Sequence, residues 1–433
     1  MGTTRRSFLR TAAIAGGALA LPSCASRRHR GPMGRDEPIN IGVVGVGGRG
    51  RDNLMAVRSE RVVALCDVDR QHLAAAQRDF PSAKVFVDFR ELVQMPGLDA
   101  VVISTPDHTH HPVAMFAVLH ELDIYCEKPL AHTVAQARRM ATASREHGLV
   151  TQMGIQIHAN ANYRRVVEAI RGGAIGAVRE VLVFVNGTDW SAAGLPPSSP
   201  VPEQLDWDLW LGPAAERPYS SAYHPAGWRR YWAFGGGTTA DMACHYMDLP
   251  FWALDLDAPR TLQSDGPEAD AEGAPAGMTC DFEFDARGER GPVRLRWWCG
   301  NLRPTEELAA RGLAAWSNGV LFVGERGWLI SNYDQHELGP AAAFRDYQPP
   351  PPSIESSPGH HLEWLRCCRD RKTPTCSFDY GGPLTETVNL ANVAYRAARG
   401  RRLQWDAAAL AFRGDDFGAN LLLDEPRRHG FDI

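Results

Sequence analysis

The sequence lacks a strong charge of either sign. Its formal net charge is only -5 over 433 residues, with 46 basic and 51 acidic side chains. A chain whose main partner is nucleic acid or an anionic membrane surface carries a marked basic excess. The charge balance therefore gives no case for either partner.

Cysteine is present, but it lacks regular spacing. The nine cysteines are scattered along the chain, and no C-x-x-C pair occurs among them. Disulfide frameworks and zinc sites depend on paired or regularly spaced cysteines. Most of these cysteines are therefore expected to be small, buried, apolar residues.

A membrane-spanning run is also missing from the N-terminal segment, which is predicted to be a targeting signal. Arg5-Arg6-Ser7-Phe8-Leu9 matches the twin-arginine export pattern, and a mildly apolar stretch follows at residues 12–21. That stretch is too short and too weakly apolar for a stable span. The alternative is a frayed helix with a chance arginine pair. We exclude residues 1–37 from the fold and expect export to the periplasm.

The end of this segment leaves two processing outcomes open. Leu21-Pro22-Ser23-Cys24 resembles a lipoprotein site, so either Cys24 is lipidated or the chain is simply cleaved nearby. A lipid on Cys24 would be the only membrane attachment that we expect. Residues 26–37 are rich in Arg, Gly and Pro and are predicted to be a flexible tether. Twin-arginine systems are understood to move folded proteins, so a cofactor could be loaded before export.

The length and composition predict an ordinary globular protein of two or three domains. The hydrophobic fraction is 44% and the charged fraction 22%. Many of the twelve tryptophans lie between Trp190 and Trp232. Sugars are often held against aromatic faces, but tryptophan also fills cores, so both interpretations stay open.

Residues 38–157 alternate between apolar strands and helices at short spacing. Predicted strands lie at residues 39–44, 61–66, 84–87, 98–104, 123–126 and 149–153. This rhythm requires a parallel sheet with right-handed crossovers, as in a Rossmann domain.

Residues 158–433 follow a different, strand-rich pattern. Predicted strands lie at residues 178–185, 278–284, 293–298, 319–324 and 327–331, with helices at 163–171, 241–254, 361–370 and 384–399. We predict an α/β domain with a large, mostly antiparallel or mixed sheet. The fold class is α/β, in two domains.

A glycine loop follows the first predicted strand directly. Its predicted phosphate-binding residues are Gly45, Gly47, Gly48, Arg49 and Gly50, which contain the pattern G-x-G-x-x-G. The glycines permit a tight turn and close approach of a pyrophosphate to a helix N-terminus. Asp67 ends the second strand, where a carboxylate binds ribose hydroxyls and repels a 2′-phosphate. The loop therefore predicts NAD rather than NADP, the alternative being a glycine turn without nucleotide.

Two further loops are expected at the same edge of the sheet. The predicted cofactor residues there are Thr105, Pro106, His108, His110 and Glu127. No carboxylate or cysteine completes a metal-ligand spacing around the histidines, so no metal site is predicted. Lys128 could donate to a substrate hydroxyl and stabilise an alkoxide, although on its own it would be an ordinary surface lysine.

Asp241 and His245 are four residues apart on a predicted helix and share a face. A carboxylate can fix the tautomer of an imidazole that acts as a general base. The same spacing is also that of an ordinary surface pair, and spacing alone favours the surface pair.

These motifs together resemble the Gfo/Idh/MocA family, named after glucose–fructose oxidoreductase and inositol dehydrogenase. The resemblance covers nearly all of residues 38–433 and extends to the segments 152–154, 163–165, 207–213, 241–248, 378–380 and 403–406. It implies that Lys128, Asp241 and His245 are catalytic: His245 takes the hydroxyl proton, Asp241 orients it and Lys128 steadies the oxyanion. It also implies a homo-oligomer formed through the open face of the second sheet.

The implied function is NAD-dependent oxidation of a CH–OH group in a sugar, glycoside or cyclitol. Weaker candidates for substrate contact are Tyr163, Arg164, Trp228, Arg229 and Tyr231. One alternative is redox-neutral glycoside hydrolysis on a resident NAD, although the motifs of such relatives are not evident here. A nucleotide-binding protein without turnover is a lesser alternative, because Lys128, Asp241 and His245 are all present.

Overall fold

The computed structural model describes residues 34, 37–414 and 416–431. The predicted leader and Cys24 lie outside these residues. Within them, no helix has the length and apolarity to cross a membrane. All eight cysteines in this part of the chain are free, and only Cys367 is not buried. The prediction that most cysteines are buried apolar residues is confirmed for this part.

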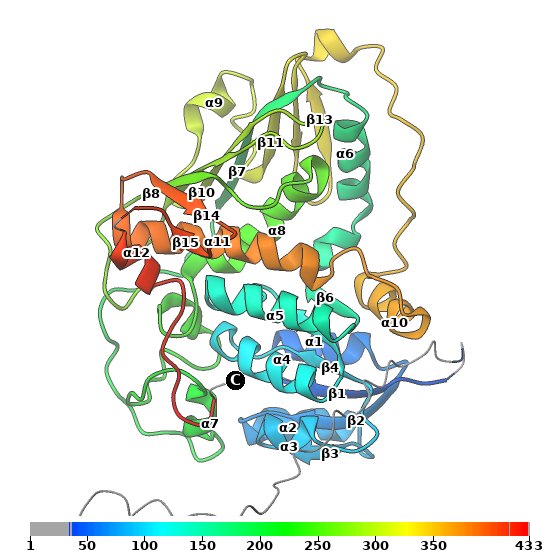
Figure 1. Ribbon diagram of the computed structural model, residues 1–433, viewed down its shortest axis with the longest axis vertical. Helices are drawn as coiled ribbons and strands as arrows, with labels where there is room; N and C mark the ends of the chain where they lie inside the picture. Colours follow the sequence, from blue (N-terminus) through cyan, green and yellow to red (C-terminus); the bar gives the residue numbers. More distant parts are fainter. Residues whose placement is uncertain (1–33, 35–36, 415, 432–433) are drawn as a thin grey trace, which may run out of the picture. The chain divides into compact units, whose positions relative to one another are not determined.

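The first sheet has six parallel strands in the order β3-β2-β1-β4-β5-β6 (Figure 1). The strands are β1 (Asn40–Val44), β2 (Arg61–Cys66), β3 (Lys84–Phe86), β4 (Ala100–Ile103), β5 (Asp123–Glu127) and β6 (Thr151–Gly154). The order reverses between β1 and β4, and such a reversal opens a ligand crevice at the carboxyl ends of the strands. The predicted parallel sheet is confirmed.

Helices cover both faces of this sheet. They are α1 (Arg49–Ala56), α2 (Arg70–Asp79), α3 (Phe89–Val93), α4 (Asp107–Leu119) and α5 (Val134–Glu146). The strands are continuously apolar because both faces of the sheet are buried. In β4, Val101 and Ile103 pack in one core cluster, whereas Ala100 and Val102 pack in the other. Helix α10 (His360–Asp370), which follows the second domain's sheet strands β7 to β13 in the chain, adds Trp364 to the second cluster.

The second sheet has nine strands in the order β13-β12-β11-β7-β10-β9-β8-β14-β15. They are β7 (Val178–Asn186), β8 (Thr261–Asp265), β9 (Thr279–Phe284), β10 (Val293–Gly300), β11 (Asn318–Gly324), β12 (Trp328–Ser331), β13 (His336–Gly339), β14 (Leu403–Asp406) and β15 (Ala411–Phe412). Among these described strands, only the β7–β10 pair is parallel. The mostly antiparallel sheet is therefore confirmed, but β8, β13, β14 and β15 had not been predicted.

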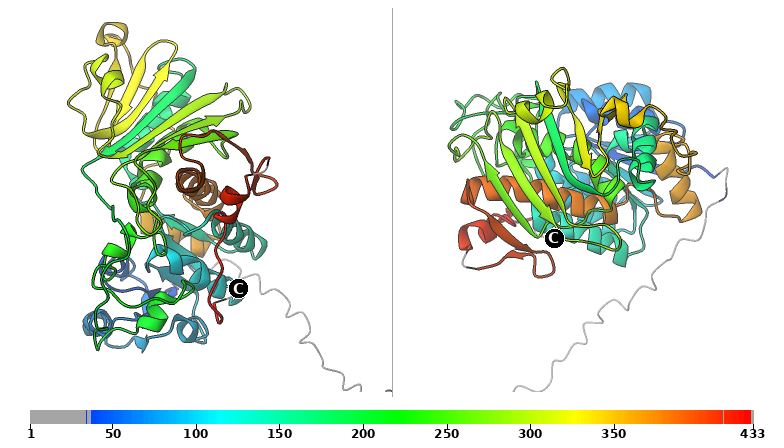
Figure 2. Two further views of the ribbon diagram at one scale, coloured as in Figure 1. Left: turned by 90° about the vertical axis from the view of Figure 1, so that its left-hand side faces the viewer. Right: turned by 90° about the horizontal axis from the view of Figure 1, so that it is seen from above.

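The inner face of the second sheet packs on long helices, which Figure 2 shows beneath the strands. The remaining helices are α6 (Ala161–Arg171), α7 (Trp207–Leu211), α8 (Gly237–Leu254), α9 (Thr305–Ala309), α11 (Phe378–Ala398) and α12 (Phe417–Leu421), with 3₁₀ turns η1 (Gln156–Ala159), η2 (Gly227–Arg230) and η3 (Ala341–Phe344). Helix α11 was predicted to begin at Leu384, but it begins at Phe378. Its Gly381 and Gly382 lie so close to Met153 and Ala141 that a Cβ would come within 2.7 and 3.0 Å of them.

The outer face of the second sheet is divided into two halves. On β7, β10, β11 and β12 the outward residues are apolar, and residues 302–316 cover them with Leu308 and Leu313. On β9 and β10 the outward residues are charged and paired, as in the 2.6 Å Arg294–Asp281 contact. The predicted homo-oligomer through the open face of this sheet stays a prediction.

Candidate active site

A cavity of about 820 Å³ lies at the carboxyl ends of the parallel strands, where the two domains meet. The first domain lines it with the glycine loop, the end of β2, the Thr105 loop and the Glu127-Lys128 turn. The second domain adds residues 224–229, the start of α8 and Tyr333. The cavity therefore contains most of the residues that the sequence motifs selected.

The glycine loop forms a cradle of backbone at the start of α1. Gly45 has a φ of +81°, and a Cβ on it would come within 2.7 Å of the Ser104 carbonyl oxygen. A Cβ on Gly50 would lie 2.0 Å from the Gly45 carbonyl oxygen. Gly48 precedes α1 and has no capping side chain. The N–H groups of Gly50 and Arg51 donate to the Gly47 and Gly48 carbonyl oxygens, which leaves the Arg49 N–H at the helix start for a ligand. This arrangement fits the pyrophosphate of a dinucleotide.

Asp67 is fixed beside this cradle. Its Oδ2 accepts a hydrogen bond from the backbone N–H of Val46 at 2.9 Å, and its Oδ1 accepts one from Asp69 at 2.9 Å. The carboxylate lines the cavity, next to the loop that would hold the phosphates. Its position fits recognition of ribose hydroxyls and disfavours a 2′-phosphate, as the sequence predicts.

Lys128 and Asp241 form the best-defined ion pair in the cavity. The Lys128 Nζ lies 2.7 Å from Asp241 Oδ1 and also donates to the Asp241 carbonyl oxygen at 2.5 Å. Trp190 Nε1 donates to Asp241 Oδ2 at 2.7 Å. Burial alone would raise the pKa of Asp241, but the charges of Lys128 and Arg229 hold it well below its usual value. Asp241 is therefore a carboxylate that holds Lys128 in place.

The predicted orientation of His245 by Asp241 is wrong. Both side chains line the cavity, but the Asp241 oxygens are taken by Lys128 and Trp190. The buried Nδ1 of His245 has no hydrogen-bond partner in the described part of the chain. Burial, followed by the nearby charge of Lys128, lowers the pKa of His245 to about 3. The imidazole is therefore neutral, and its enclosed Nδ1 is not held by Asp241.

Several predicted cofactor residues are placed as expected, and one is not. Arg49, Thr105, Pro106 and His110 line the cavity. His110 also braces the site, since its ring nitrogens lie 2.9 Å from the carbonyl oxygens of Thr105 and Pro129.

His108 was expected to line the nicotinamide side of the site and does not. Its Nε2 lies 3.0 Å from the Trp210 carbonyl oxygen, and its ring packs against Trp210 and Phe234. The first turn of α4 directs this side chain to the second domain's aromatic cluster, away from the cavity. Its position makes it a packing residue.

Glu127 joins three elements behind the cavity. Its Oε1 accepts hydrogen bonds from Asn53 Nδ2 at 2.8 Å and Gln156 Nε2 at 2.7 Å, and Arg49 lies 3.6 Å away. The carboxylate is nearly buried, yet it lines the cavity. It therefore holds the glycine-loop helix and η1 against the turn that carries Lys128.

The five weaker substrate candidates divide into two groups. Trp228 and Arg229 line the cavity. Tyr163, Arg164 and Tyr231 do not, and their proposed substrate contacts are corrected to packing roles. Tyr163 is fully buried below His245, Arg164 donates to the Glu355 carbonyl oxygen at 2.6 Å, and Tyr231 packs against Tyr223.

The sequence did not indicate several cavity residues. They are Gln156, Met242, His224 and Tyr333, together with Trp190, which bonds Asp241. Tyr333 comes from the turn between β12 and β13, far along the chain from every motif. The tryptophan-rich composition was the only sequence signal that pointed to any of them.

The loop between Gly194 and Tyr231, which the sequence could not place, crosses back onto the first domain. We call residues 199–234 the crossover loop. Its Asp206 N–H donates to the Val68 carbonyl oxygen at 2.9 Å, and Arg70 N–H donates to Gln204 at 2.9 Å. His224 Nε2 lies 3.0 Å from Asp69 Oδ2. The crossover loop therefore closes the ribose end of the cavity.

Asp69, His72 and His224 bring three possible metal-ligand atoms within 4.8 Å of one another. Both oxygens of Asp69 already have partners: Oδ1 accepts from the Gln71 N–H at 2.8 Å, and Oδ2 faces His224. His72 Nδ1 lies 3.7 Å from Asp67 Oδ2, and the Asp67 carboxylate raises the pKa of His72. Hydrogen bonding accounts for this cluster, and we assign no metal to it.

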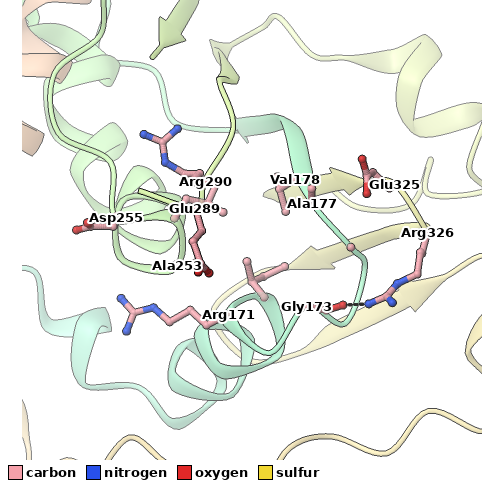
Figure 3. Close-up of a pocket in the computed structure, with 13 residues that line it drawn as sticks. Arg171, Gly173, Ala177, Val178, Ala253, Asp255, Glu289, Arg290, Glu325 and Arg326 are labelled. Carbon is pink, nitrogen blue, oxygen red and sulfur yellow. Dashed lines mark hydrogen bonds between the residues drawn. The ribbon is translucent and has the colours of Figure 1, made fainter. Parts of the chain in front are cut away.

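A second cavity, of about 780 Å³, lies at the ends of α6 and α8 (Figure 3). Its charged residues are Arg171, Arg290, Arg326, Asp255, Glu289 and Glu325. Positive and negative groups balance there, and Arg326 is tied to the Gly173 carbonyl oxygen. None of the predicted catalytic residues lines it.

Comparison with known families agrees with this architecture. Residues 39–155 match the profile described as "Oxidoreductase family, NAD-binding Rossmann fold", and residues 161–285 match "Oxidoreductase family, C-terminal alpha/beta domain". The chain belongs to the Gfo/Idh/MocA oxidoreductase family. Its first domain is therefore an NAD-binding Rossmann domain, and the predicted family and cofactor are confirmed.

Curated relatives of this Gfo/Idh/MocA chain are inositol 2-dehydrogenases. The enzyme of Rubrobacter xylanophilus is 36% identical over 149 residues, which cover 33% of this chain and 43% of that protein. The enzyme of Acidothermus cellulolyticus is 32% identical over 149 residues, or 33% of this chain and 44% of that protein. The chain thus matches less than half the length of these relatives.

Solved structures share the fold over most of the chain. The WlbA dehydrogenase from Bordetella pertussis, in complex with NADH and UDP-GlcNAcA, has a TM-score of 0.61 at 20% identity, covering 86% of this chain and 99% of that one. An aldose-aldose oxidoreductase from Caulobacter crescentus has a TM-score of 0.58 at 16% identity, with 85% and 100% covered. At these identities the likeness concerns the fold alone.

Proposed function

We propose that this protein is an NAD-dependent oxidoreductase that acts on a CH–OH group of a sugar, glycoside or cyclitol. One observation carries the proposal: Lys128, Asp241 and His245 meet in the cavity that also contains the glycine loop and Asp67. The similarity to enzymes named inositol 2-dehydrogenase supports it. NAD, when bound, accepts the hydride that leaves the substrate carbon.

The cavity residues have different roles toward the substrate hydroxyl. Lys128, held by Asp241 at 2.7 Å, donates to the oxygen and stabilises its negative charge. The neutral His245, which lines the cavity, accepts the hydroxyl proton. Asp241 holds Lys128 in place in the cavity.

We propose in addition that NAD is a resident cofactor of an exported enzyme. The crossover loop spans the ribose end through the Asp206, Gln204 and His224 contacts, so the nucleotide must disturb this loop to leave. The Arg5-Arg6 leader motif supports twin-arginine export with the cofactor already loaded, followed by residence in the periplasm. A cofactor that does not exchange also supports a second candidate, redox-neutral glycoside hydrolysis.

The decisive experiment is purification without added cofactor. We expect about one NAD per chain after extensive dialysis, measured by absorbance and by mass spectrometry of the released nucleotide. Sugars, cyclitols and glycosides are then added one at a time, and NADH formation is followed. Glycoside cleavage without net NADH would select the hydrolase. A chain that neither binds NAD nor changes any of these substrates would refute the proposal.

Loss of the contact between His224 and Asp69 should loosen the retained nucleotide. His224→Ala removes the 3.0 Å contact and is expected to accelerate NAD release by about fivefold, since one such hydrogen bond contributes about 1 kcal/mol. The release rate is measured by dilution into an NAD-scavenging enzyme. His120→Ala, at the exposed end of α4, is the control and should not change it. Equal release from both variants would contradict the role of the crossover loop.

A further inference from the structure

The Asp107 carboxyl is an unexplained group in the active-site cavity. It is the first residue of α4, it lines the same cavity as Lys128, Asp241 and His245, and it is only 5% exposed. No residue in the described part of the chain donates a hydrogen bond to it. Its oxygens are not among the enclosed, partnerless side-chain atoms of the described residues, so the carboxyl is open to the cavity.

Charged groups on three neighbouring elements face Asp107. Arg229 on η2, together with Lys128 and His132 on the segment after β5, favours the carboxylate, whereas Asp241 on α8 opposes it. Both Lys128 and Arg229 already contact Asp241, at 2.7 and 3.4 Å. Burial outweighs these charges and raises the pKa of Asp107 to about 7.

The titratable groups of the cavity are therefore separated in their affinity for a proton. Asp241 remains a carboxylate, because Lys128 and Arg229 hold its pKa low. His245 remains neutral, with a pKa lowered to about 3 by burial. A group that titrates near neutral pH is best suited to take and return a proton, and such separation assigns acid and base roles.

We propose that Asp107 is a further proton-transfer residue of this active site, and that the proton of the substrate hydroxyl ends on its carboxylate. The proposal rests on the proposed oxidation of a CH–OH group. In that reaction the O–H and C–H bonds break and a C=O bond forms. Two electrons leave with the hydride to bound NAD, and the proton passes from the oxygen to the carboxylate of Asp107, which lines the same cavity. His245 is too weakly basic to keep that proton, because burial lowers its pKa to about 3. In the reverse direction the neutral Asp107 returns the proton.

Asp107→Asn tests this role, because asparagine keeps the shape but cannot exchange a proton. For the wild type, kcat/KM for oxidation should rise with pH through about 7, as Asp107 becomes a carboxylate. The variant should lose this rise and about 10²–10⁴-fold of the rate, with KM and NAD affinity almost unchanged. Glu386→Gln is the matched control. Glu386 is also a buried acid with a raised pKa, but it is bonded to Arg138 away from the cavity.

Thermal unfolding provides a readout that needs no turnover. The pKa of Asp107 is raised in the folded chain above its ordinary value of 3.8, so the wild type loses stability as pH rises from about 4 to about 7. The Tm of Asp107→Asn relative to the wild type should therefore increase between pH 5 and pH 8. A residue that only shapes the helix start would give the same difference at both pH values.

The outcomes separate the two proposals. An active wild type whose Asp107→Asn variant keeps the rate and the rise near pH 7 would overturn the role of Asp107 alone. A wild type that oxidises no alcohol would overturn the proposed function and the proton transfer with it. Loss of the pH-dependent rise together with the pH-dependent Tm difference would support the role.

Discussion

Lys128→Met is expected to lower kcat by about 10³-fold while leaving NAD affinity within about threefold of the wild type. Methionine fills similar space but removes the only lysine among the described residues that line the cavity. It also leaves Asp241 without its 2.7 Å partner, so the pKa of that buried carboxyl rises. The measurements are steady-state kinetics by NADH absorbance and NAD titration by calorimetry.

The control for this variant is Lys84→Met, which changes an exposed lysine on β3 and should keep full activity. Two results would count against the assignment. One is a Lys128→Met enzyme with wild-type kcat. The other is a loss of NAD binding equal to the loss of rate, because Lys128 would then hold the cofactor instead of acting on the substrate.

Gly50→Ala is expected to weaken NAD binding by at least about 100-fold, which corresponds to about 2.8 kcal/mol. The new Cβ would lie 2.0 Å from the Gly45 carbonyl oxygen, and backbone cannot swing aside as a side chain can. The loop must open, and the N–H groups at the start of α1 then no longer converge on the phosphates. NAD titration by calorimetry measures the loss, and far-ultraviolet circular dichroism confirms the fold.

Gly418→Ala is the matched control for this substitution. A Cβ on Gly418 would meet no other atom within 4 Å in the described part of the chain, and the backbone there does not adopt a positive φ. The variant should therefore bind NAD normally. Unchanged NAD affinity in Gly50→Ala would mean that the dinucleotide does not use this loop.

The first domain could be predicted from the sequence because each strand is a short apolar run between turn residues. Buried parallel strands such as β4 are apolar at every position, so they need no alternation of apolar and polar residues. The turn residues on either side mark where such strands begin and end. The start of α11 could not be predicted, because Gly381, Gly382 and Pro383 suggest a break in an isolated helix. Only the close packing against Met153 and Ala141 explains why a helix includes those glycines.

The site shows a similar limit. The sequence located Lys128 at a strand end and Asp241 on a helix, and both reach the cavity. The spacing of residues along a helix shows which of them share a face, but it does not show which residue of another element packs against that face. Asp241 therefore pairs with Lys128, from the other domain, instead of with His245. The same limit explains why His108 faces the aromatic cluster.

The covered outer face of the second sheet has a consequence for assembly. Its apolar half is already buried under residues 302–316, and its free half carries pairs such as Arg294–Asp281 and Arg402–Glu283. Two copies that met on this half would have to remove these charges from water, at a cost that hydrophobic contact does not offset. Any association through this half would depend on exchanging ion pairs between subunits, and its strength would fall as ionic strength rises.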